Sequence, residues 1–136
     1  MAGSTYARGR SFEYRVKYAL MDAGYEVARS PMSRGPWDLA GHKCGAFISD
    51  TPSNGRIAVT VTDRIYVQCK FHARGTATCL RGYVPPADWN RLWDSAQAAD
   101  ARPLVAYNDA KGHIRFMELT ARKRAHQKQP WCDWEP

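Results

Sequence analysis

Apolar residues recur at spacings of three and four in two stretches of the chain, and this spacing predicts two helices. The first runs from about residue 6 to residue 23 and ends before Gly24, a residue that commonly stops a helix in the left-handed conformation. The second runs from about residue 86 to residue 99, and two prolines mark its entry. The predicted buried stripes are Phe12, Val16, Ala19, Leu20 and Ala23 in the first helix and Trp89, Leu92, Trp93 and Ala96 in the second.

Alternating or β-branched runs predict strands between and after these helices. The clearest covers residues 65–71, where apolar and polar side chains alternate. Asn54-Gly55 is typical of a tight hairpin turn and lies between two further runs. The other predicted strands are residues 25–28, 37–40, 46–48, 57–61, 104–107 and 114–119, the last two as a hairpin. The element order favours one mixed sheet with helices packed on it, an α/β or α+β sandwich.

Composition limits the class of protein. A length of 136 residues fits one domain, and 44% hydrophobic with 24% charged residues excludes a largely disordered chain. No apolar run is long enough to cross a bilayer, and the first ten residues do not resemble a secretory signal. Cys44, Cys69, Cys79 and Cys132 are widely spaced, so we expect free thiols in a reducing cytosol and no zinc site.

The net charge of +7 and the sequence pI near 9.5 indicate a polyanionic partner. Such a surplus favours nucleic acid over a membrane surface, because a long basic amphipathic helix is missing. Charge alone does not predict a fold.

Three separated polar signals stand out from the apolar pattern. Glu13 lies near the edge of the first helical stripe, and Asp38 follows a Gly-Pro turn at the start of a strand. Gln68 and Lys70 alternate along the clearest strand, so both project from one face. Each signal alone has a simpler interpretation: a solvated helix edge, a turn cap, and the wet face of a sheet.

Taken in order, these signals resemble the PD-(D/E)xK nuclease superfamily, with Pro36-Trp37-Asp38 and Gln68-Cys69-Lys70 as its two signature elements. Residues 9–13, 24–30 and 33–38 are similar to the archaeal-type Holliday-junction resolvases, and the similarity spans about residues 9–119. The most specific part is the loop pattern Arg-Ser-x-x-Ser-x-Gly-x-x-Asp, which ends at Asp38. The resemblance implies a restriction-endonuclease-like α/β fold, a mixed central sheet flanked by helices.

The resemblance also implies a Mg²⁺ site, with Mn²⁺ able to substitute, because phosphodiester hydrolysis needs charge neutralisation and an activated water. Asp38, the side-chain oxygen of Gln68 and the backbone carbonyl of Cys69 would be ligands, and Glu13 would reach the metal directly or through water. Lys70 would orient the attacking water and stabilise the phosphate in the transition state. Ser33 matches a loop serine that assists at the scissile phosphate. The expected DNA-binding residues are Arg10, Arg29 and Arg34, which match or adjoin basic positions of the family, with Arg74 and Arg81 beside the site.

Two departures from the resolvase pattern affect these expectations. Gln68 stands where most resolvases have Glu, which lowers the negative charge available to the cation, although Gln-x-Lys also occurs in active Mrr-like nucleases. The spacing between Asp38 and Lys70 is longer than usual, with the excess in residues 43–63, which we interpret as an elongated surface hairpin that contacts DNA or is merely tolerated.

The end of the chain is expected to differ from the rest. We divide it into a nuclease domain, residues 1–120, and a basic, Trp-containing C-terminal tail, residues 121–136. Arg122-Lys123-Arg124 would grip DNA or aid solubility. Trp131 and Trp134 are expected to dock on the domain or on a second subunit, since exposed aromatic side chains are unfavourable.

These features favour a Mg²⁺-dependent endonuclease that resolves four-way DNA junctions as a homodimer, because two cuts on opposed strands require two sites. We place it in the cytoplasm of a prokaryotic or phage-infected cell. Two alternatives remain open at this level: an Mrr-like or restriction-type nuclease acting on duplex DNA, and a non-catalytic DNA-binding module. If the nuclease interpretation holds, the arginines should surround a small acidic pocket.

Overall fold

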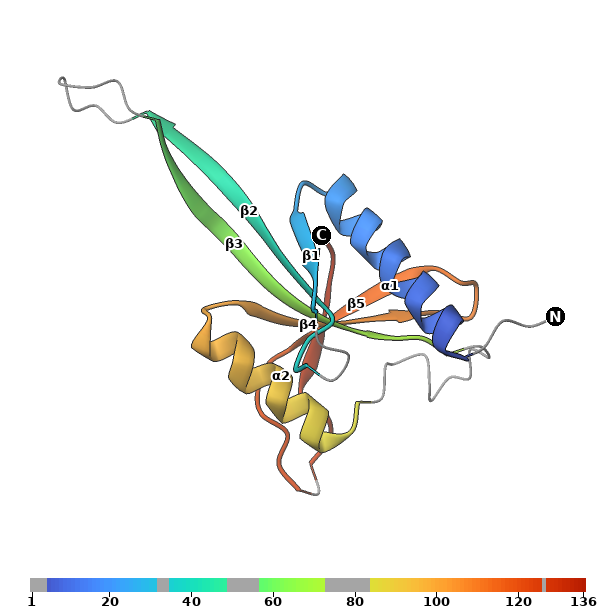
Figure 1. The fold of residues 1–136 in the computed structure, drawn as a ribbon. Helices are drawn as coiled ribbons and strands as arrows, with labels where there is room; N and C mark the ends of the chain where they lie inside the picture. The colour runs from blue at the N-terminus through green and yellow to red at the C-terminus, as the bar shows by residue number, and fades with distance from the viewer. Residues whose placement is uncertain (1–4, 32–34, 49–56, 73–83, 126) are drawn as a thin grey trace.

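The computed structural model describes residues 5–31, 35–48, 57–72, 84–125 and 127–136. Six strands form one sheet, in the spatial order β1-β2-β3-β4-β5-β6, with two helices beside it (Figure 1). The elements in chain order are α1 (Thr5–Asp22), β1 (Glu26–Arg29), β2 (Leu39–Ile48), β3 (Ile57–Lys70), α2 (Pro86–Ala98), β4 (Arg102–Asn108), β5 (Ile114–Leu119) and β6 (Trp131–Trp134).

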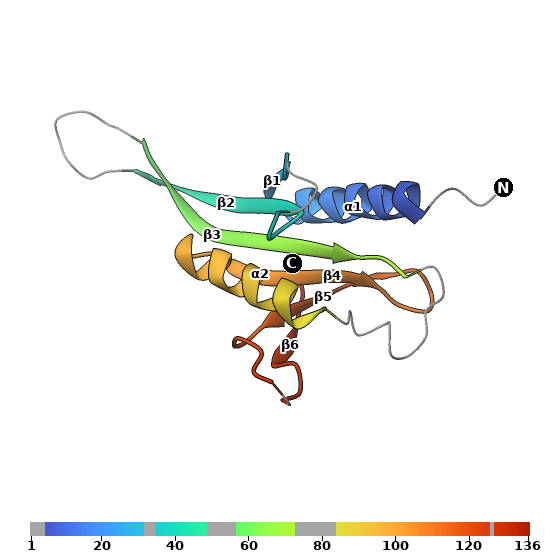
Figure 2. The same ribbon diagram turned by 60° about the horizontal axis from the view of Figure 1, so that its bottom comes forward.

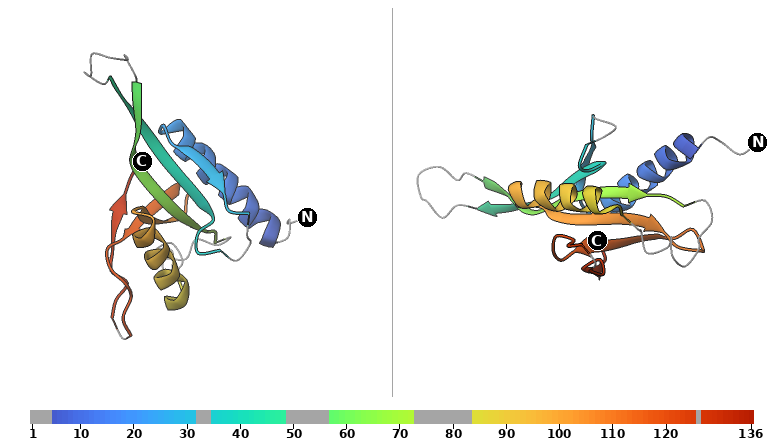
Figure 3. Two further views of the ribbon diagram at one scale, coloured as in Figure 1. Left: turned by 60° about the vertical axis from the view of Figure 1, so that its left-hand side comes forward. Right: turned by 90° about the horizontal axis from the view of Figure 1, so that it is seen from below.

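The sheet is mixed, as the sequence predicted. β3 and β4 are parallel, because α2 carries the chain back across the sheet between them, and all other neighbouring strands are antiparallel. α1 and α2 lie on opposite faces of the sheet (Figure 3). The sheet is therefore covered from both sides in its central part, where two buried clusters form the core.

Both helices begin and end close to the predicted residues. α1 stops before Gly24, whose φ of 98° requires the left-handed conformation that glycine adopts without strain. α2 has Pro86 at its start, and after its end Asp100 takes a φ of 52°, a position more commonly given to glycine. Among the described residues, no helix combines the length and the apolar character needed to cross a lipid bilayer.

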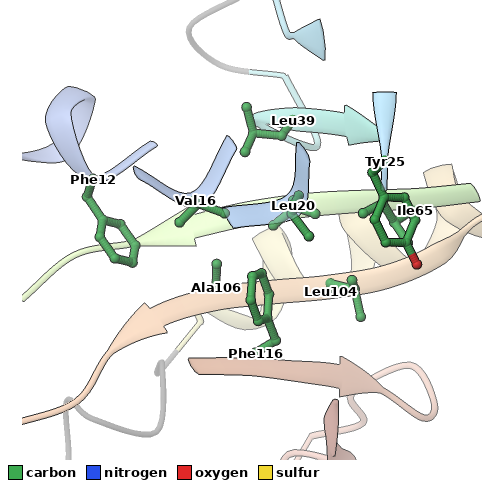
Figure 4. Close-up of a cluster of buried hydrophobic side chains, with 10 residues drawn as sticks. Phe12, Val16, Leu20, Tyr25, Leu39, Ile65, Leu104, Ala106 and Phe116 are labelled. Atoms are coloured by element: carbon green, nitrogen blue, oxygen red, sulfur yellow. The ribbon is translucent and has the colours of Figure 1, made fainter. Parts of the chain in front are cut away.

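The cluster under α1 joins the helix to the sheet (Figure 4). Phe12, Val16 and Leu20 are at most 1% exposed, and they pack on strand residues from β2 to β5. Burying each such side chain contributes about 1.5 to 3 kcal/mol. The strand residues of this cluster are Leu39, Ile65, Val67, Leu104, Ala106 and Phe116, with Tyr25 at the start of β1. The predicted stripe of α1 is thus its core face, and this face fixes Glu13 beside β1.

The cluster under α2 has Trp89 at its centre, with no exposed surface. The indole Nε1–H of Trp89 donates to the backbone carbonyl of Ala121 at 2.9 Å, which ties α2 to the segment after β5. The other buried members are Val84, Leu92, Val105, Tyr107, Met117 and Leu119. Trp93 is only partly buried and packs at the margin of the same cluster. The position of α2 on the sheet is therefore set mainly by Trp89 and Leu92.

β2 and β3 form a long hairpin that extends past the other strands (Figures 1 and 2). β3 pairs with β4 only from Ile65 onward, so its first eight residues, Ile57 to Arg64, pair with β2 alone among the described strands. A shift in register between Lys43 and Cys44 marks the point where the hairpin leaves the sheet. The elongated hairpin that was inferred for residues 43–63 is thus present, and its strands are longer than the short runs predicted at residues 46–48 and 57–61. The predicted turn at residues 52–55 lies outside the described residues.

β6 was not predicted. It pairs antiparallel with β5, so part of the segment 121–136 belongs to the central sheet. Trp134 packs edge-on against Phe116, with 5.4 Å between ring centroids, and lies 6.2 Å from the ring of Tyr25. Trp131 packs against the cluster under α2. The two tryptophans therefore dock on the chain's own domain, one on each core cluster.

An ionic network lies at the end of the sheet where β4 begins. Arg102 donates two hydrogen bonds to the carboxylate of Glu118 and approaches Asp63, which accepts a hydrogen bond from the hydroxyl of Tyr25. Burial is the main cause that raises the pKa of Tyr25 above its ordinary value. A hollow of about 750 Å³ opens beside this network, at the opposite end of β4 from Lys70 and its neighbours. The network links β3, β4 and β5 through Arg102, which contacts Asp63 on β3 and Glu118 on β5.

Candidate active site

Asp38 immediately precedes β2 and is held by hydrogen bonds to β3, where the pairing of β2 with β3 begins. Its backbone N–H donates to the carbonyl of Val67 at 2.8 Å, and its Oδ2 accepts a hydrogen bond from the N–H of Cys69 at 2.7 Å. Trp37, directly before it, stacks on Tyr66 with 5.0 Å between ring centroids. The side chain of Asp38 thus takes the place that a further β2 residue would occupy in the ladder.

The carbonyl of Cys69 leaves β3 on the same side as its N–H, because both backbone groups of a strand residue point toward the same neighbouring strand. That N–H is bound by Asp38, so the Cys69 carbonyl is directed to the edge of β3 where Asp38 lies. Two of the expected metal ligands, the carboxylate of Asp38 and the carbonyl of Cys69, therefore lie on the same side of β3. This arrangement results from the start of β2 at Leu39, one residue after Asp38, and not from a turn cap.

The electrostatic environment of Asp38 includes three other predicted site residues, Glu13, Arg29 and Lys70. Burial raises the pKa of Asp38, and the N–H of Cys69 opposes this rise by stabilising the carboxylate. The carboxylate of Glu13 also raises the pKa, whereas the cations of Lys70 and Arg29 lower it. Glu13, Arg29, Asp38 and Lys70, which are far apart in the sequence, are thus close enough in space to act on one carboxyl group.

The raised pKa of Asp38 leads to a prediction about stability. A carboxyl group whose pKa is higher in the folded state contributes stability at low pH and loses this contribution as the pH rises through its folded-state pKa. Asn at position 38 stays neutral and keeps an oxygen that can accept from Cys69. We therefore expect Asp38→Asn to be more stable than the wild type at pH 7, with the difference shrinking below about pH 4. Urea unfolding at both pH values measures this.

Asp94→Asn provides the control, because Arg122 lowers the pKa of the exposed Asp94 carboxylate. Its contribution to stability is present at neutral pH and disappears on acidification, so this variant should gain nothing at pH 7. A wild type that is more stable than Asp38→Asn at pH 7 would contradict the burial cost assigned to Asp38.

Glu13 and Arg29 form an ion pair across the gap between α1 and β1. Nη2 of Arg29 donates to Oε2 of Glu13 at 2.9 Å, and its Nε donates to the same oxygen at 3.3 Å. The side chains of Arg29 and Glu13 are 31% and 24% exposed, so the pair is only half-buried. A residue predicted for the metal and a residue predicted for DNA phosphate are therefore bound to each other in this structure.

Tyr14 lies between two of the predicted arginines and was missed in the sequence. Nη1 of Arg29 donates to its hydroxyl at 3.3 Å, and the Arg29 guanidinium lies 4.9 Å from its ring centroid. Arg10 approaches the same ring at 6.0 Å, and its interaction with the hydroxyl is the largest cause that lowers the pKa of Tyr14. The spacing of four residues between Arg10 and Tyr14 on a helix was the available signal.

Gln68 and Lys70 share one face of the sheet, as their alternation predicted, and in the structure this is the face that α2 covers. Oε1 of Gln68 is buried, and among the described residues no donor lies within hydrogen-bond distance of it. A buried oxygen without a partner costs free energy, so this atom is suited to a cation or a bound water. Lys70 is 26% exposed, and its Nζ lies 3.7 Å from Oδ2 of Asp88 on α2.

These residues fit a hard cation such as Mg²⁺. Asp38 supplies a carboxylate, Gln68 an unpartnered amide oxygen and Cys69 a carbonyl, and Mg²⁺ prefers such oxygens while keeping several waters. Within the described parts of the chain, no group of three or more His, Cys, Asp or Glu side chains could hold a metal ion. A cation bound here would therefore depend on neutral oxygens and water as well as on carboxylates.

Asp88 and Asn108 contact the end of β3 and the residues that follow it, and the sequence did not indicate either. Asn108 is 6% exposed; its Oδ1 accepts from the N–H of His72 at 2.9 Å and its Nδ2 donates to the His72 carbonyl at 2.7 Å. This double contact holds the chain just after Lys70. Neither residue shows a pattern that sequence reasoning could use, because both contacts join segments distant along the chain.

Four predicted residues cannot be placed beside these. Ser33, Arg34, Arg74 and Arg81 lie outside the described residues, and their predicted roles stay predictions. The expectation that arginines surround a small acidic pocket can be followed only for Arg10 and Arg29. Both lie on the α1 side, close to Glu13.

The fold of this chain is similar to that of a known enzyme. The structure of Hjc, a Holliday junction resolvase from the archaeal hyperthermophile Archaeoglobus fulgidus, superimposes with a TM-score of 0.57 and 19% sequence identity. The match covers 92% of this chain and 88% of the resolvase. The chain shares the fold of Hjc. The predicted α/β class, a mixed central sheet flanked by helices, is thereby confirmed.

Similarity at the sequence level is weaker. No protein-family model matches the chain, and no curated protein is similar to it in sequence. The likeness to Hjc therefore concerns the fold, and the activity must be argued from the residues of the site.

Proposed function

We propose that this protein is a Mg²⁺-dependent endonuclease that resolves four-way DNA junctions. The observation that carries the proposal is the hydrogen bond from the backbone N–H of Cys69 to Asp38, which holds a half-buried carboxylate against the segment of β3 that carries Gln68 and Lys70. The fold shared with a Holliday junction resolvase supports the same activity. The net charge of +7 suits a polyanionic substrate.

The proposed reaction is hydrolysis of a phosphodiester. A water oxygen forms a bond to phosphorus while one ester P–O bond breaks, and the released alcohol takes a proton. Mg²⁺, or Mn²⁺ in its place, would neutralise charge on the phosphate and activate the water when bound. Asp38, Gln68 and the Cys69 carbonyl would hold the ion, and Glu13 would act on it directly or through water.

The cationic side chains have separate roles in this proposal. Lys70 lies on the same face as Gln68, where its ammonium group would stabilise the charge that develops on the phosphate. Arg29 and Arg10 would bind flanking phosphates, and Arg29 would then exchange part of its contact with Glu13 for the DNA. Recognition through phosphates predicts strong dependence of affinity on salt and little dependence on base sequence.

Paired cleavage of a two-fold symmetric junction requires two sites in opposed orientation. A homodimer satisfies this requirement with one site in each subunit. Ser33, Arg34, Arg74 and Arg81 are proposed to contact the DNA near the scissile phosphate. The protein would act in the cytoplasm of a prokaryotic or phage-infected cell.

One assay tests the proposal. Purified protein with Mg²⁺ is given a four-way junction, or a linear duplex of the same sequence, and Asp38→Asn serves as the control without a metal-binding carboxylate. We expect symmetric nicks in the junction alone and none with the variant. Equal cutting of both substrates would instead indicate an Mrr-like or restriction-type duplex nuclease.

A non-catalytic DNA-binding module is the second candidate, and the replacement of a carboxylate by Gln68 favours it. Fewer charged ligands weaken the hold on a cation. Tight junction binding without cleavage in either Mg²⁺ or Mn²⁺ would support this candidate and exclude both nucleases.

A further inference from the structure

The contact between Lys70 and Asp88 joins the end of β3 to the first turn of α2. Nζ of Lys70 lies 3.7 Å from Oδ2 of Asp88, and the two side chains are 26% and 33% exposed. A lysine side chain has a flexible four-carbon stem, so the position of its ammonium group is well defined only when a partner restrains it. Asp88 is such a partner, on the face of the sheet that carries Gln68.

The backbone position of Asp88 is set by its neighbour Trp89, the largest buried side chain of α2. Asp88 precedes Trp89, which has no exposed surface and whose indole is bound by the carbonyl of Ala121. The Trp89 N–H donates to the carbonyl of Pro85 at 2.9 Å, which closes the first turn around Asp88. Because this turn is packed against the sheet through Trp89, the position of the Asp88 carboxylate relative to β3 is restricted. Functional groups on such rigid elements are positioned more precisely than groups on loops.

We propose that Asp88 is a positioning residue that holds the ammonium group of Lys70 toward the scissile phosphate. This inference rests on the proposed nuclease function and adds to it a residue outside the signature elements. Asp88 does not touch the substrate; it acts through Lys70. A carboxylate in the first turn of a helix also interacts favourably with the helix dipole and so stabilises the helix. If this were the only role of Asp88, its replacement would affect stability but not the cleavage rate of the folded protein.

Single-turnover cleavage of a four-way junction in Mg²⁺ distinguishes the two roles. We expect Asp88→Asn to lower the maximal rate by about 10- to 100-fold, because a displaced cation no longer meets the developing charge. The protein concentration at half-saturation should change by less than about threefold, since Lys70 serves the reaction and not ground-state binding. Asp88→Glu, which keeps a carboxylate within reach of Lys70, should recover part of the rate.

Asp94→Asn is the matched control. It removes a carboxylate from the same helix and breaks a similar ion pair, with Arg122 at 2.8 Å, on an exposed surface. Its cleavage rate should equal that of the wild type, and the urea midpoints of the two variants should be similar.

The outcomes separate this inference from the proposed function. If the wild type cleaves and Asp88→Asn cleaves equally fast, the positioning role is wrong and the nuclease function stands. The same conclusion follows if Asp88→Asn loses activity only in proportion to lost folding, or if Asp88→Glu is no better than Asp88→Asn. A wild type that cleaves nothing overturns the nuclease function, and the positioning role with it.

Discussion

Replacing Lys70 by Ala should reduce junction cleavage by about three orders of magnitude, because the ammonium group that stabilises the charge on the phosphate is lost. Junction affinity should stay within a few-fold of the wild type, since phosphate binding is distributed over several arginines. Single-turnover cleavage and a binding titration at one salt concentration measure the two effects.

Circular dichroism and urea unfolding supply the control for Lys70→Ala. Lys70 is 26% exposed and paired with Asp88 at 3.7 Å, so its removal should leave the fold intact. A variant that unfolds would mark Lys70 as a structural residue. A folded variant with wild-type cleavage would remove Lys70 from the mechanism.

Trp89→Ala should be the most destabilising of the substitutions considered, with a cost of about 3 to 5 kcal/mol. Trp89 has no exposed surface, and its removal leaves a cavity under α2 and an unpaired carbonyl at Ala121. A domain of this size has a free energy of unfolding of about 5 to 15 kcal/mol, so a large part of it would be lost. Urea unfolding at pH 7 measures the change.

Tyr18→Ala serves as the comparison, because Tyr18 is 58% exposed on α1 and should cost less than about 0.5 kcal/mol. Trp89→Phe divides the cost into its parts, since it keeps most of the apolar burial but lacks the N–H donor to Ala121. Equal stability of Trp89→Ala and the wild type would mean that α2 is not held by this cluster.

The helices and most strands could be predicted because their patterns are local. The stripe of Phe12, Val16 and Leu20 and the stop at Gly24 determine α1 almost completely. β6 could not be predicted, because four residues carry too little alternation and its pairing depends on β5 being present. The elongated β2–β3 hairpin was inferred from the long spacing between Asp38 and Lys70 and is present, but the lengths of its strands were underestimated, because the strands were predicted from short apolar runs alone.

The candidate site was predictable to a similar degree. Alternation predicted that Gln68 and Lys70 share one face, and the loop pattern selected Asp38 as a candidate; the catalytic roles of these residues stay predictions. The partners of these residues depend on where helices dock, which no local pattern encodes. For this reason neither the Glu13–Arg29 pair nor the contact between Lys70 and Asp88 could be predicted.

The pairing of β6 with β5 has a consequence for synthesis on the ribosome. Trp134 completes the packing around Phe116 and Tyr25, and Gln129 donates a hydrogen bond to the carbonyl of Val84 at 2.8 Å, just before α2. The nascent chain therefore exposes an unfinished edge and part of its core until residues 129–134 have emerged. Tyr25, which is made early, and Phe116 therefore reach their final packing only when β6 is in place.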